Sequence, residues 1–400
     1  MGELRTRKRG KTWEWSFEGA KVEGKRKPIS KGGYRTKAEA LAAGTQAKAE
    51  YDNTGRSFKP SEISVSDYLD YWFTNYVTVN LSYNTQIDYE RKTRIHIKPV
   101  LGHYRLASLE PDAIQRWIDG KKADGYSQSM IKNIFICLSG AMDYAVYPCN
   151  YIKFNPCSYV RIPKVNIDPK QKEHTEYICN KDDYAAIMER FPKGSNFYIS
   201  LITAYNCGTR IGETYGFDLL KDVDFKNHTI SIRHQLKKEN GVWVYRPPKY
   251  DSYRTIKMIP EHETALKQEI HERKKNMLRY GPYYTKTYLL PDNSLMQAKA
   301  NVDVSYPEIM PISVKENGEL LTPESFKYCA RVIHEELGNP LFHSHCLRHT
   351  HGTILAEGGA QPKTVMERLG HRDIKTTMER YVFNTEKMQD DAVRIFVNAT

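Results

Sequence analysis

The most informative run in the 400-residue chain reads His343-Ser344-His345-Cys346-Leu347-Arg348-His349-Thr350-His351, its densest group of reactive side chains. Two short segments follow it, Leu369-Gly370-His371 and Thr376-Thr377-Met378-Glu379-Arg380-Tyr381. His345 and His349 have the four-residue spacing of two zinc ligands on one helix face. However, no Glu follows His345, and no carboxylate cluster nearby supplies a third ligand or a general base. Metal ligation is therefore the weaker of two interpretations.

The second interpretation adds an arginine from far upstream, Arg210 in Gly208-Thr209-Arg210-Ile211-Gly212-Glu213. Two arginines can clamp one phosphate, because each planar guanidinium holds two non-bridging oxygens and offsets the charge that develops at phosphorus. A tyrosine can then attack as a covalent nucleophile, and a lysine or histidine can protonate the departing oxygen. This chemistry predicts phosphoryl transfer that needs no metal ion and no cofactor.

With these motifs the chain resembles the tyrosine recombinase (phage integrase) family, and most closely the integrases of conjugative transposons. His345-Cys-Leu-Arg348-His349 matches the family's His-x-x-Arg-His motif, and Leu369-Gly370-His371 matches its Leu-Gly-His motif. Tyr381 lies ten residues beyond His371, at the position of the family's nucleophile. Further matches are the first arginine box at Arg210 to Glu213 and the hairpin lysine at Lys249.

The resemblance implies a role for each matched residue. Arg210 and Arg348 are expected to clamp the phosphate, with His345 and His371 completing the phosphate contacts. Tyr381 is expected to form a 3′-phosphotyrosyl link while sharing proton transfer with His345, and Lys249 to protonate the 5′-hydroxyl. Supporting positions are expected at Glu213, which would orient Arg210, and at His349, behind the site. Other histidines and lysines keep lesser or alternative roles: His343 and His351 as structural or solvated side chains, and Lys237, Lys238 and Lys257 as rivals of Lys249.

The resemblance also implies partners. The family acts on double-stranded DNA as a homo-tetramer, so we expect core sites and arm sites in DNA, and an excisionase or a DNA-bending factor as a candidate partner. After Tyr381, the apolar Met388, Ala392, Ile395 and Phe396 fall on one face of a predicted tail helix. That helix is expected to dock on a neighbouring protomer, with docking on its own domain as the alternative. A DNA-binding regulator without catalysis, a metal-dependent nuclease, and a type IB topoisomerase or resolvase remain as alternative functions.

Composition agrees with a nucleic-acid partner. The chain has 60 Lys and Arg against 48 Asp and Glu, a formal charge of +12, and ten basic but only four acidic residues fall within residues 1–31. No apolar run is long enough for a membrane span or a signal peptide. Seven scattered cysteines form no Cys-x-x-Cys pair, which favours a reducing compartment. Composition thus favours the cytoplasm without membrane contact, and the family resemblance implies a bacterial protein associated with the nucleoid.

Three domains are predicted. Residues 1–57 combine alternating Trp13, Trp15 and Phe17 with a Thr36-x-x-Glu39 capping box that opens a helix to about Tyr51, a pattern typical of a small three-stranded sheet plus one helix. Residues 62–162 show helical spacing throughout and resemble the family's core-site-binding domain. Basic residues of both regions are expected to bind DNA: Arg7, Lys8, Arg9, Lys25, Arg26 and Lys27 in the first, and Arg91, Lys92, Arg94 and Lys132 in the second.

The third domain, residues 175–400, is predicted to be a mixed α+β catalytic domain. Helices are expected over 182–191 and 195–205, and another from Thr322-Pro323-Glu324. Between them, one three-stranded antiparallel sheet is expected from strands 229–236, 242–245 and 255–259, with a Glu239-Asn240-Gly241 turn. No element is predicted within residues 281–318.

Overall fold

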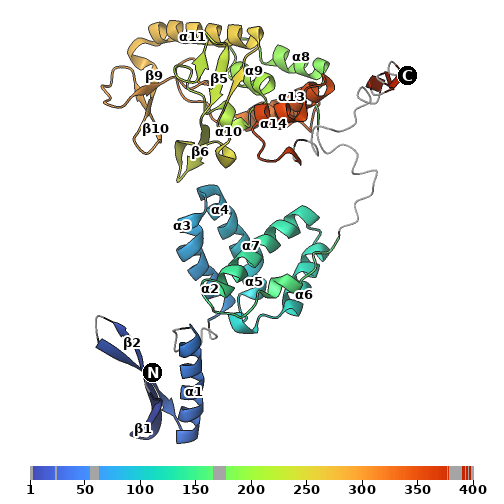
Figure 1. Ribbon diagram of the computed structural model, residues 1–400. Helices are drawn as coiled ribbons and strands as arrows, with labels where there is room; N and C mark the ends of the chain where they lie inside the picture. Colours follow the sequence, from blue (N-terminus) through green and yellow to red (C-terminus); the bar gives the residue numbers. More distant parts are fainter. Residues whose placement is uncertain are drawn as a thin grey trace. The chain divides into compact units, whose positions relative to one another are not determined.

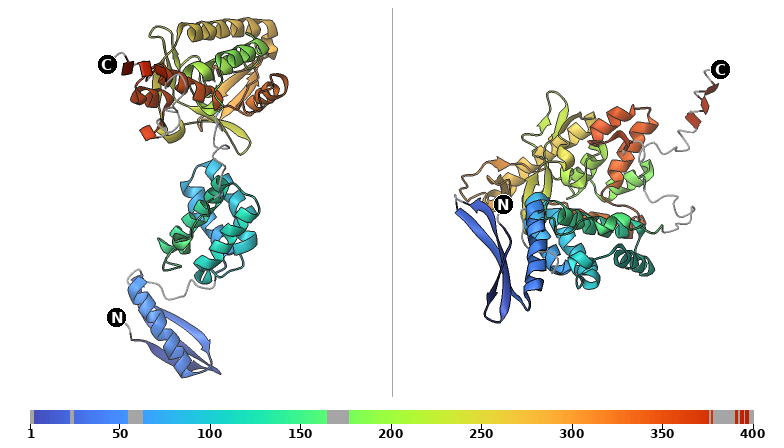
Figure 2. Two further views of the ribbon diagram at one scale, coloured as in Figure 1. Left: turned by 90° about the vertical axis from the view of Figure 1, so that its right-hand side faces the viewer. Right: turned by 60° about the horizontal axis from the view of Figure 1, so that its bottom comes forward.

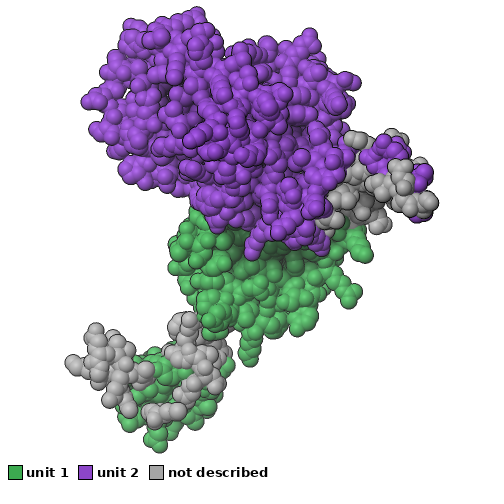
Figure 3. Space-filling model, turned by 45° about the horizontal axis from the view of Figure 1, so that its top comes forward, with its two compact units in different colours: residues 1–167 green, residues 168–400 purple. Residues whose placement is uncertain are grey.

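The computed structural model describes residues 3–22, 25–54, 63–164, 177–375, 377, 390–391, 393–394 and 396–397. The chain divides into two compact units, Met1–Ile167 and Asp168–Thr400, which Figure 3 shows in two colours. This boundary lies between residues 162 and 175, the predicted ends of the second and third domains. The further division of the first unit at residues 57–62 stays a prediction.

The N-terminal part of unit 1 is an antiparallel sheet in the order β1-β2-β3, formed by β1 (Arg5–Arg9), β2 (Thr12–Val22) and β3 (Lys25–Tyr34). Helix α1 (Lys37–Thr54) lies along one face of the sheet (Figures 1 and 2). The alternation in β2 buries Trp15 and Phe17 on that face, as the pattern predicts. The predicted cap is present, because Thr36 Oγ1 accepts the Glu39 amide at 3.2 Å. Helix α1 runs somewhat beyond the predicted end near Tyr51.

The rest of unit 1 is helical, which confirms that prediction. Its helices are α2 (Val65–Trp72), α3 (Thr78–Asn80), α4 (Tyr83–Lys92), α5 (Lys98–Leu101), α6 (Pro111–Ala123) and α7 (Gln128–Val146). Ser64 and Ser127 cap α2 and α7, each accepting a backbone amide three residues on. The apolar positions at helical spacing, including Tyr68, Trp72 and Trp117, form one core.

Unit 2 is the mixed α+β domain. Its helices are α8 (Lys181–Arg190), α9 (Tyr198–Cys207), α10 (Ile211–Thr214), α11 (Pro260–Tyr280), α12 (Phe326–Glu336), α13 (Cys346–Glu357) and α14 (Pro362–Leu369). Among its described residues the strands form three sheets. The first holds β4 (Val223–Asp224), β5 (Thr229–Ile232) and β8 (Arg254–Lys257), and the second holds β6 (Gln235–Glu239) and β7 (Val242–Arg246). The third holds β9 (Thr285–Leu289), β10 (Leu295–Lys299) and β11 (Glu308–Ile309). Figure 1 shows α11 along one side of β5 and α9, with α13 and α14 on the other.

The single sheet predicted over residues 229–259 is wrong. The chain leaves strand geometry at Arg233 and His234, so that β5 pairs with β4 and β8 while β6 pairs with β7. Tertiary contacts account for the break. The backbone of Gly216 lies so close to the His234 carbonyl that a Cβ would approach its oxygen to 2.5 Å, and the Tyr245 amide donates to Asn293 in another loop. The predicted turn is present, with positive φ at Asn240 and Gly241.

Two other differences concern residues 281–325. The β9–β11 sheet lies in the region for which the sequence predicts no element, because its strands are short and rich in Thr, Lys and Gln. Helix α12 begins at Phe326 rather than at Pro323, since residues 322–325 form a turn in which the Ser325 amide donates to the Thr322 carbonyl. Within the described parts of the chain, every helix is too short or too polar to span a lipid bilayer.

Candidate active site

The histidine-rich run leads into α13, whose first turns it forms from Cys346 onward. Cys346 and Leu347 face the core of unit 2, which fixes the helix and buries Arg348 and His349 beside them. His345 precedes the helix and is exposed, and its ring lies 6.4 Å from that of His343 and 6.3 Å from that of His349, centroid to centroid. Arg348 Nη1 donates to the Gly208 carbonyl at 2.9 Å. Helix α13 is thereby joined to the Arg210 segment.

Gly208 permits this close approach. It ends α9 with φ of 63°, a left-handed conformation that favours glycine. A Cβ at Gly208 would lie 2.6 Å from the His351 ring and 2.7 Å from the Leu369 side chain. The glycine therefore lets the chain turn between α13 and α14 and carry Arg210 directly into the site.

Arg210 is held by Glu213 of the next helical turn. Its Nη1 donates to Glu213 Oε1 at 2.7 Å, and its backbone amide donates to Oε2 at 3.1 Å. Arg254 Nη2 donates to the same Oε2 at 2.7 Å. Burial alone would raise the pKa of the Glu213 carboxyl, but the charge of Arg254, with those of Arg210 and Arg348, holds that pKa below its usual range. A buried carboxylate thus orients the side chain of Arg210.

The Leu-Gly-His segment closes the site from a third direction. Helix α14 ends at Gly370, whose φ of 68° is again left-handed, and Arg210 Nη2 donates to the Gly370 carbonyl at 3.1 Å. His371 follows, with its Nδ1 2.8 Å from Thr377 Oγ1. A cleft of about 660 Å³ lies between this segment and residues 250–257, and His371 lines it. His371 therefore lies next to the Arg210 contacts.

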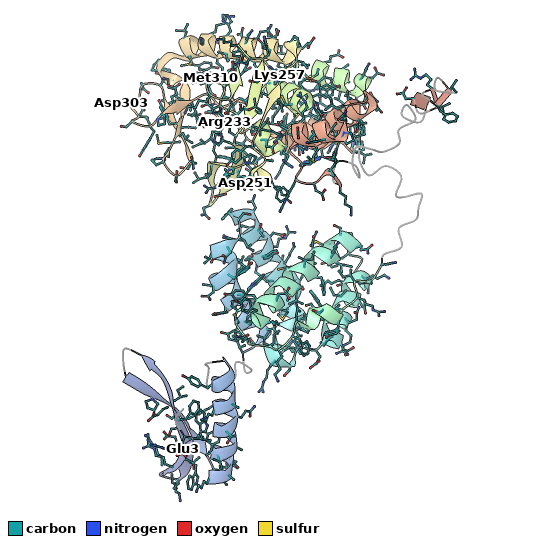
Figure 4. All side chains as sticks on the ribbon, viewed as in Figure 1. Glu3, Arg233, Asp251, Lys257, Asp303 and Met310 are labelled. Carbon is teal, nitrogen blue, oxygen red and sulfur yellow. The ribbon has the colours of Figure 1, made fainter. Side chains whose placement is uncertain are left out.

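Lys249 begins a short helical turn between β7 and β8, in which Tyr250 and Asp251 have positive φ. It is exposed, and its Nζ lies 4.9 Å from the centroid of the Tyr250 ring. Figure 4 shows Asp251 of this turn at one edge of unit 2, away from Lys257 at the other end of β8. The turn is tied to the site through Ser252, whose carbonyl accepts from Arg254 Nη1 at 3.1 Å.

The rival lysines differ in what surrounds them. Lys257 Nζ donates to the Asn227 carbonyl at 2.8 Å, and Lys238 pairs with Glu324 at 3.2 Å. Lys237 is close to Lys249: burial lowers the pKa of Lys237, and Lys249 lowers it further, whereas Glu239 raises it. Lys257 and Lys238 are thus engaged with other parts of unit 2, and the assignment of Lys249 as the acid stays a prediction.

A second network, which the sequence did not reveal, lies behind the arginines. Arg368 Nε donates to His351 Nε2 at 3.0 Å, and His351 Nδ1 lies 2.8 Å from the Tyr205 carbonyl. Burial, and then the charge of Arg368, lower the pKa of His351 to about 4, so His351 is neutral near pH 7 and can accept from Arg368. The same guanidinium donates to the carbonyls of Asn206 and Lys257. Arg368 therefore links α14 to the ends of α9 and β8.

Neither Arg254 nor Arg368 belongs to a motif that predicts a role for it. The available signal was position: Arg254 lies five residues after Lys249, and Arg368 directly precedes Leu369-Gly370-His371. Tyr381 and the tail residues Met388, Ala392 and Ile395 fall outside the described residues. Of the tail, residues 390–391, 393–394 and 396–397 are helical, and Phe396 is exposed.

The residues predicted to bind DNA are mostly exposed where the structure describes them. Arg7 and Arg9 are both exposed and both pair with Glu14, at 3.6 Å and 2.7 Å. Lys92 and Arg94 pair within their own helical stretch with Asp88 and Glu90. Other members of the set stand as follows: Lys8, Arg91 and Lys132 are exposed, and the side chains of Lys25, Arg26 and Lys27 lie outside the description. No group of three or more potential metal-binding side chains occurs among the described residues.

Two family models match the chain. The model of the phage integrase family matches residues 179–388, which is more than half of the 400-residue chain. The model of the phage integrase N-terminal SAM-like domain matches residues 64–122, within the helical part of unit 1.

Proteins of similar sequence cover most of the chain. A XerC-like tyrosine recombinase of Caldanaerobacter subterraneus subsp. tengcongensis is 25% identical over 373 residues, which are 90% of this chain and 89% of the relative. The transposase from transposon Tn916 of Enterococcus faecalis is 24% identical over 301 residues, 72% of this chain and 66% of the relative.

Solved structures support the same fold. The integrase of transposon Tn1549, in complex with transposon right end DNA, superposes with a TM-score of 0.64 at 23% identity, over 84% of this chain and 100% of that one. Lambda integrase, solved as a tetramer bound to a Holliday junction, gives a TM-score of 0.53 at 16% identity over 93% of each chain. The order of the sheet, the helical region and the α+β domain agrees with these structures.

Proposed function

The chain belongs to the phage integrase family and is a tyrosine recombinase, and we propose that it integrates and excises a mobile DNA element by covalent cleavage and rejoining of DNA strands. The observation that carries this mechanism is that Arg210 and Arg348, from separate parts of unit 2, both act on one buried carboxylate, Glu213, while the Gly370 carbonyl accepts from Arg210 and the Gly208 carbonyl from Arg348. Such a cluster of preoriented cations suits one phosphate group.

Arg210 and Arg348 are the phosphate clamps in this proposal. A guanidinium has five N–H donors, and Arg210 uses two side-chain nitrogens to contact Glu213 and Gly370. Its side chain is 18% exposed, so a phosphate oxygen can approach the other N–H groups of the guanidinium from the surface. Because both arginines are fixed before DNA binds, little reorganisation is needed as charge develops at phosphorus.

In the chemical step, Tyr381 Oη attacks the scissile phosphorus and the bond from phosphorus to the 5′ oxygen breaks. The phenol proton passes to His345, and Lys249 gives a proton to the departing 5′ oxygen, while His371 contacts the phosphate. The product is a 3′-phosphotyrosyl link and a free 5′-hydroxyl. A 5′-hydroxyl of another strand reverses the step, so that strands are exchanged without nucleotide hydrolysis, metal or cofactor.

The N-terminal sheet is proposed to bind arm-type sites. Strand register places Arg5, Arg7 and Arg9 opposite Ser16, Glu14 and Thr12, on the sheet face that α1 leaves uncovered. A β-ribbon fits the major groove, and arginine is the commonest reader of guanine. Alternation places Lys8 on the other face, opposite Trp13, so Lys8 is suited to a backbone contact instead. The basic residues of α4 and α7 are proposed to bind the cleavage sites.

The proposed assembly is a homo-tetramer joined through the tail helix. Lambda integrase is a tetramer on a Holliday junction in its solved structure, and Val393, Phe396 and Val397 are at least 64% exposed here. We also propose action in the bacterial cytoplasm on nucleoid DNA, with an excisionase or a DNA-bending factor setting direction.

Deleting residues 384–400 is expected to abolish tetramers on DNA while leaving monomer binding to a single site intact, because the deletion removes the proposed docking helix. Analytical ultracentrifugation with a duplex carrying one or two sites measures this. Unchanged tetramers and unchanged recombination would instead favour docking of the tail on its own domain.

The full chain is expected to form a covalent DNA adduct that resists denaturation and persists in EDTA. The probe is a nicked duplex carrying the joined ends of the mobile element that encodes the chain, designed so that the short cleaved strand diffuses away. Gel electrophoresis with strand-specific labels then locates the link at a 3′ end. Cleavage that EDTA abolishes would favour the metal-dependent nuclease, and binding without any adduct would favour the inactive regulator.

A further inference from the structure

Arg254 contacts three segments that carry catalytic candidates. Its Nη2 donates to Glu213, which holds Arg210; its Nη1 donates to Ser252, in the turn of Lys249; and its Nε donates to the Arg368 carbonyl at 2.8 Å, at the end of α14 before His371. The side chain is 7% exposed. One guanidinium therefore bridges α10, the β7–β8 turn and α14.

The lack of a side chain at Gly370 makes room for this guanidinium. A Cβ on Gly370 would lie 2.7 Å from Arg254 Nη1 and 3.0 Å from its Cζ, so the left-handed glycine at the end of α14 is what admits the guanidinium. The planar fork then matches three acceptors in different directions. Lysine at the same position has a charge of the same sign but no fork that reaches all three.

We propose that Arg254 is a positioning residue for strand cleavage, which acts through Glu213 to orient Arg210 and at the same time sets the Lys249 turn against the His371 segment. Arg254 acts through protein contacts with the segments that bear the reacting groups, and the proposal includes no contact between Arg254 and DNA. This inference rests on the proposed cleavage chemistry, and it names a residue outside the set that the family motifs supply.

The same contacts give the proposal a characteristic pH dependence. Three charged side chains face Glu213: Arg210 beside it, Arg254 from β8 and Arg348 from α13. Without the charge of Arg254, less positive charge offsets the effect of burial on the Glu213 carboxylate. The pKa of Glu213 then rises, and the carboxyl takes up a proton at a higher pH than in the wild type. A protonated Glu213 no longer holds the Arg210 guanidinium as a charged acceptor.

Single-turnover cleavage of the nicked duplex by the full-length Arg254→Gln variant is expected to be about 10²-fold slower near pH 7, with DNA affinity unchanged, because misplaced groups lose rate rather than binding. The ratio of the wild-type rate to the variant rate should increase as the pH falls, because Glu213 takes up its proton first in the variant, and should decrease at higher pH; the titration of His345 and His371 is common to both proteins. Arg254→Lys should restore the wild-type pH profile in part, but not the full rate.

A matched control is Arg273→Gln. Arg273 is also buried and also donates to one carboxylate, Glu269, and to two carbonyls, but it lies on α11 away from the site. The Arg273→Gln substitution should lower thermal stability without changing the pH profile of cleavage. In a double-mutant cycle, Arg254→Gln should slow the Glu213→Gln variant by much less than it slows the wild type.

Stability gives a readout that does not need cleavage. The stabilisation from the depressed pKa of Glu213 is present above the unfolded pKa of about 4 and is lost below it. The melting-temperature difference between wild type and Arg254→Gln should therefore widen as the pH rises from the depressed folded pKa of wild-type Glu213 to the higher folded pKa of the variant, and level off above that. A difference that is constant with pH, or additive rates in the cycle, would overturn the positioning role while wild-type adduct formation still upheld the recombinase chemistry. Failure of the wild type to form any adduct would overturn both.

Discussion

Tyr381→Phe is expected to eliminate the covalent DNA adduct while leaving binding to the same duplex unchanged. Phenylalanine keeps the ring but lacks the Oη atom that would bond to phosphorus, so no phosphotyrosyl link can form. Tyr381 lies ten residues after His371, and Tyr328 is the nearest preceding tyrosine, so no tyrosine near the Leu-Gly-His motif competes for the role. Denaturing electrophoresis of the labelled duplex measures the adduct, and mobility shift measures binding.

The matched control is Tyr328→Phe, because Tyr328 is an exposed tyrosine on α12. This variant should form the adduct at the wild-type rate. An adduct formed by Tyr381→Phe would assign the nucleophile to another residue, and peptide mapping of the DNA-linked fragment would then identify it.

Arg210→Lys is expected to bind DNA but to cleave about 10²- to 10³-fold more slowly, comparable to the loss of one oriented donor at a developing oxyanion. The reason is geometric. The Arg210 side chain donates to both Glu213 and Gly370 while remaining partly exposed, and a single ammonium cannot keep both contacts and also present a fork to phosphate.

Single-turnover rates on the nicked duplex, with affinity measured separately, test this expectation. Arg190→Lys is the control, since Arg190 also forms a two-pronged pair with a carboxylate, Glu336, but on the surface of unit 2. A wild-type cleavage rate for Arg210→Lys would remove Arg210 from the clamp. A loss of DNA affinity with an unchanged cleavage rate at saturating protein would show ground-state binding instead of transition-state stabilisation.

Local signals predicted several elements of both units. The Thr36 cap of α1, the helix over residues 182–191 and the Asn240-Gly241 turn depend on residues close together in the chain, and the structure contains each of them. The β9–β11 sheet was missed because short polar strands carry little hydrophobic alternation, and their pairing is decided by partners elsewhere in the chain.

The sequence by itself determined the family, the order of the three regions and the candidate residues from Arg210 to Tyr381, because motif spacing and periodicity are local properties of the chain. Only the tertiary structure revealed that Arg254 and Arg368 support them. Hydrogen bonds from Arg254 to Glu213 and to the Arg368 carbonyl join residues far apart in sequence. The glycines at 208 and 370 matter because side chains from distant elements would lie within about 3 Å of a Cβ there. Contacts of that kind depend on how packed elements meet, which no spacing along the chain encodes.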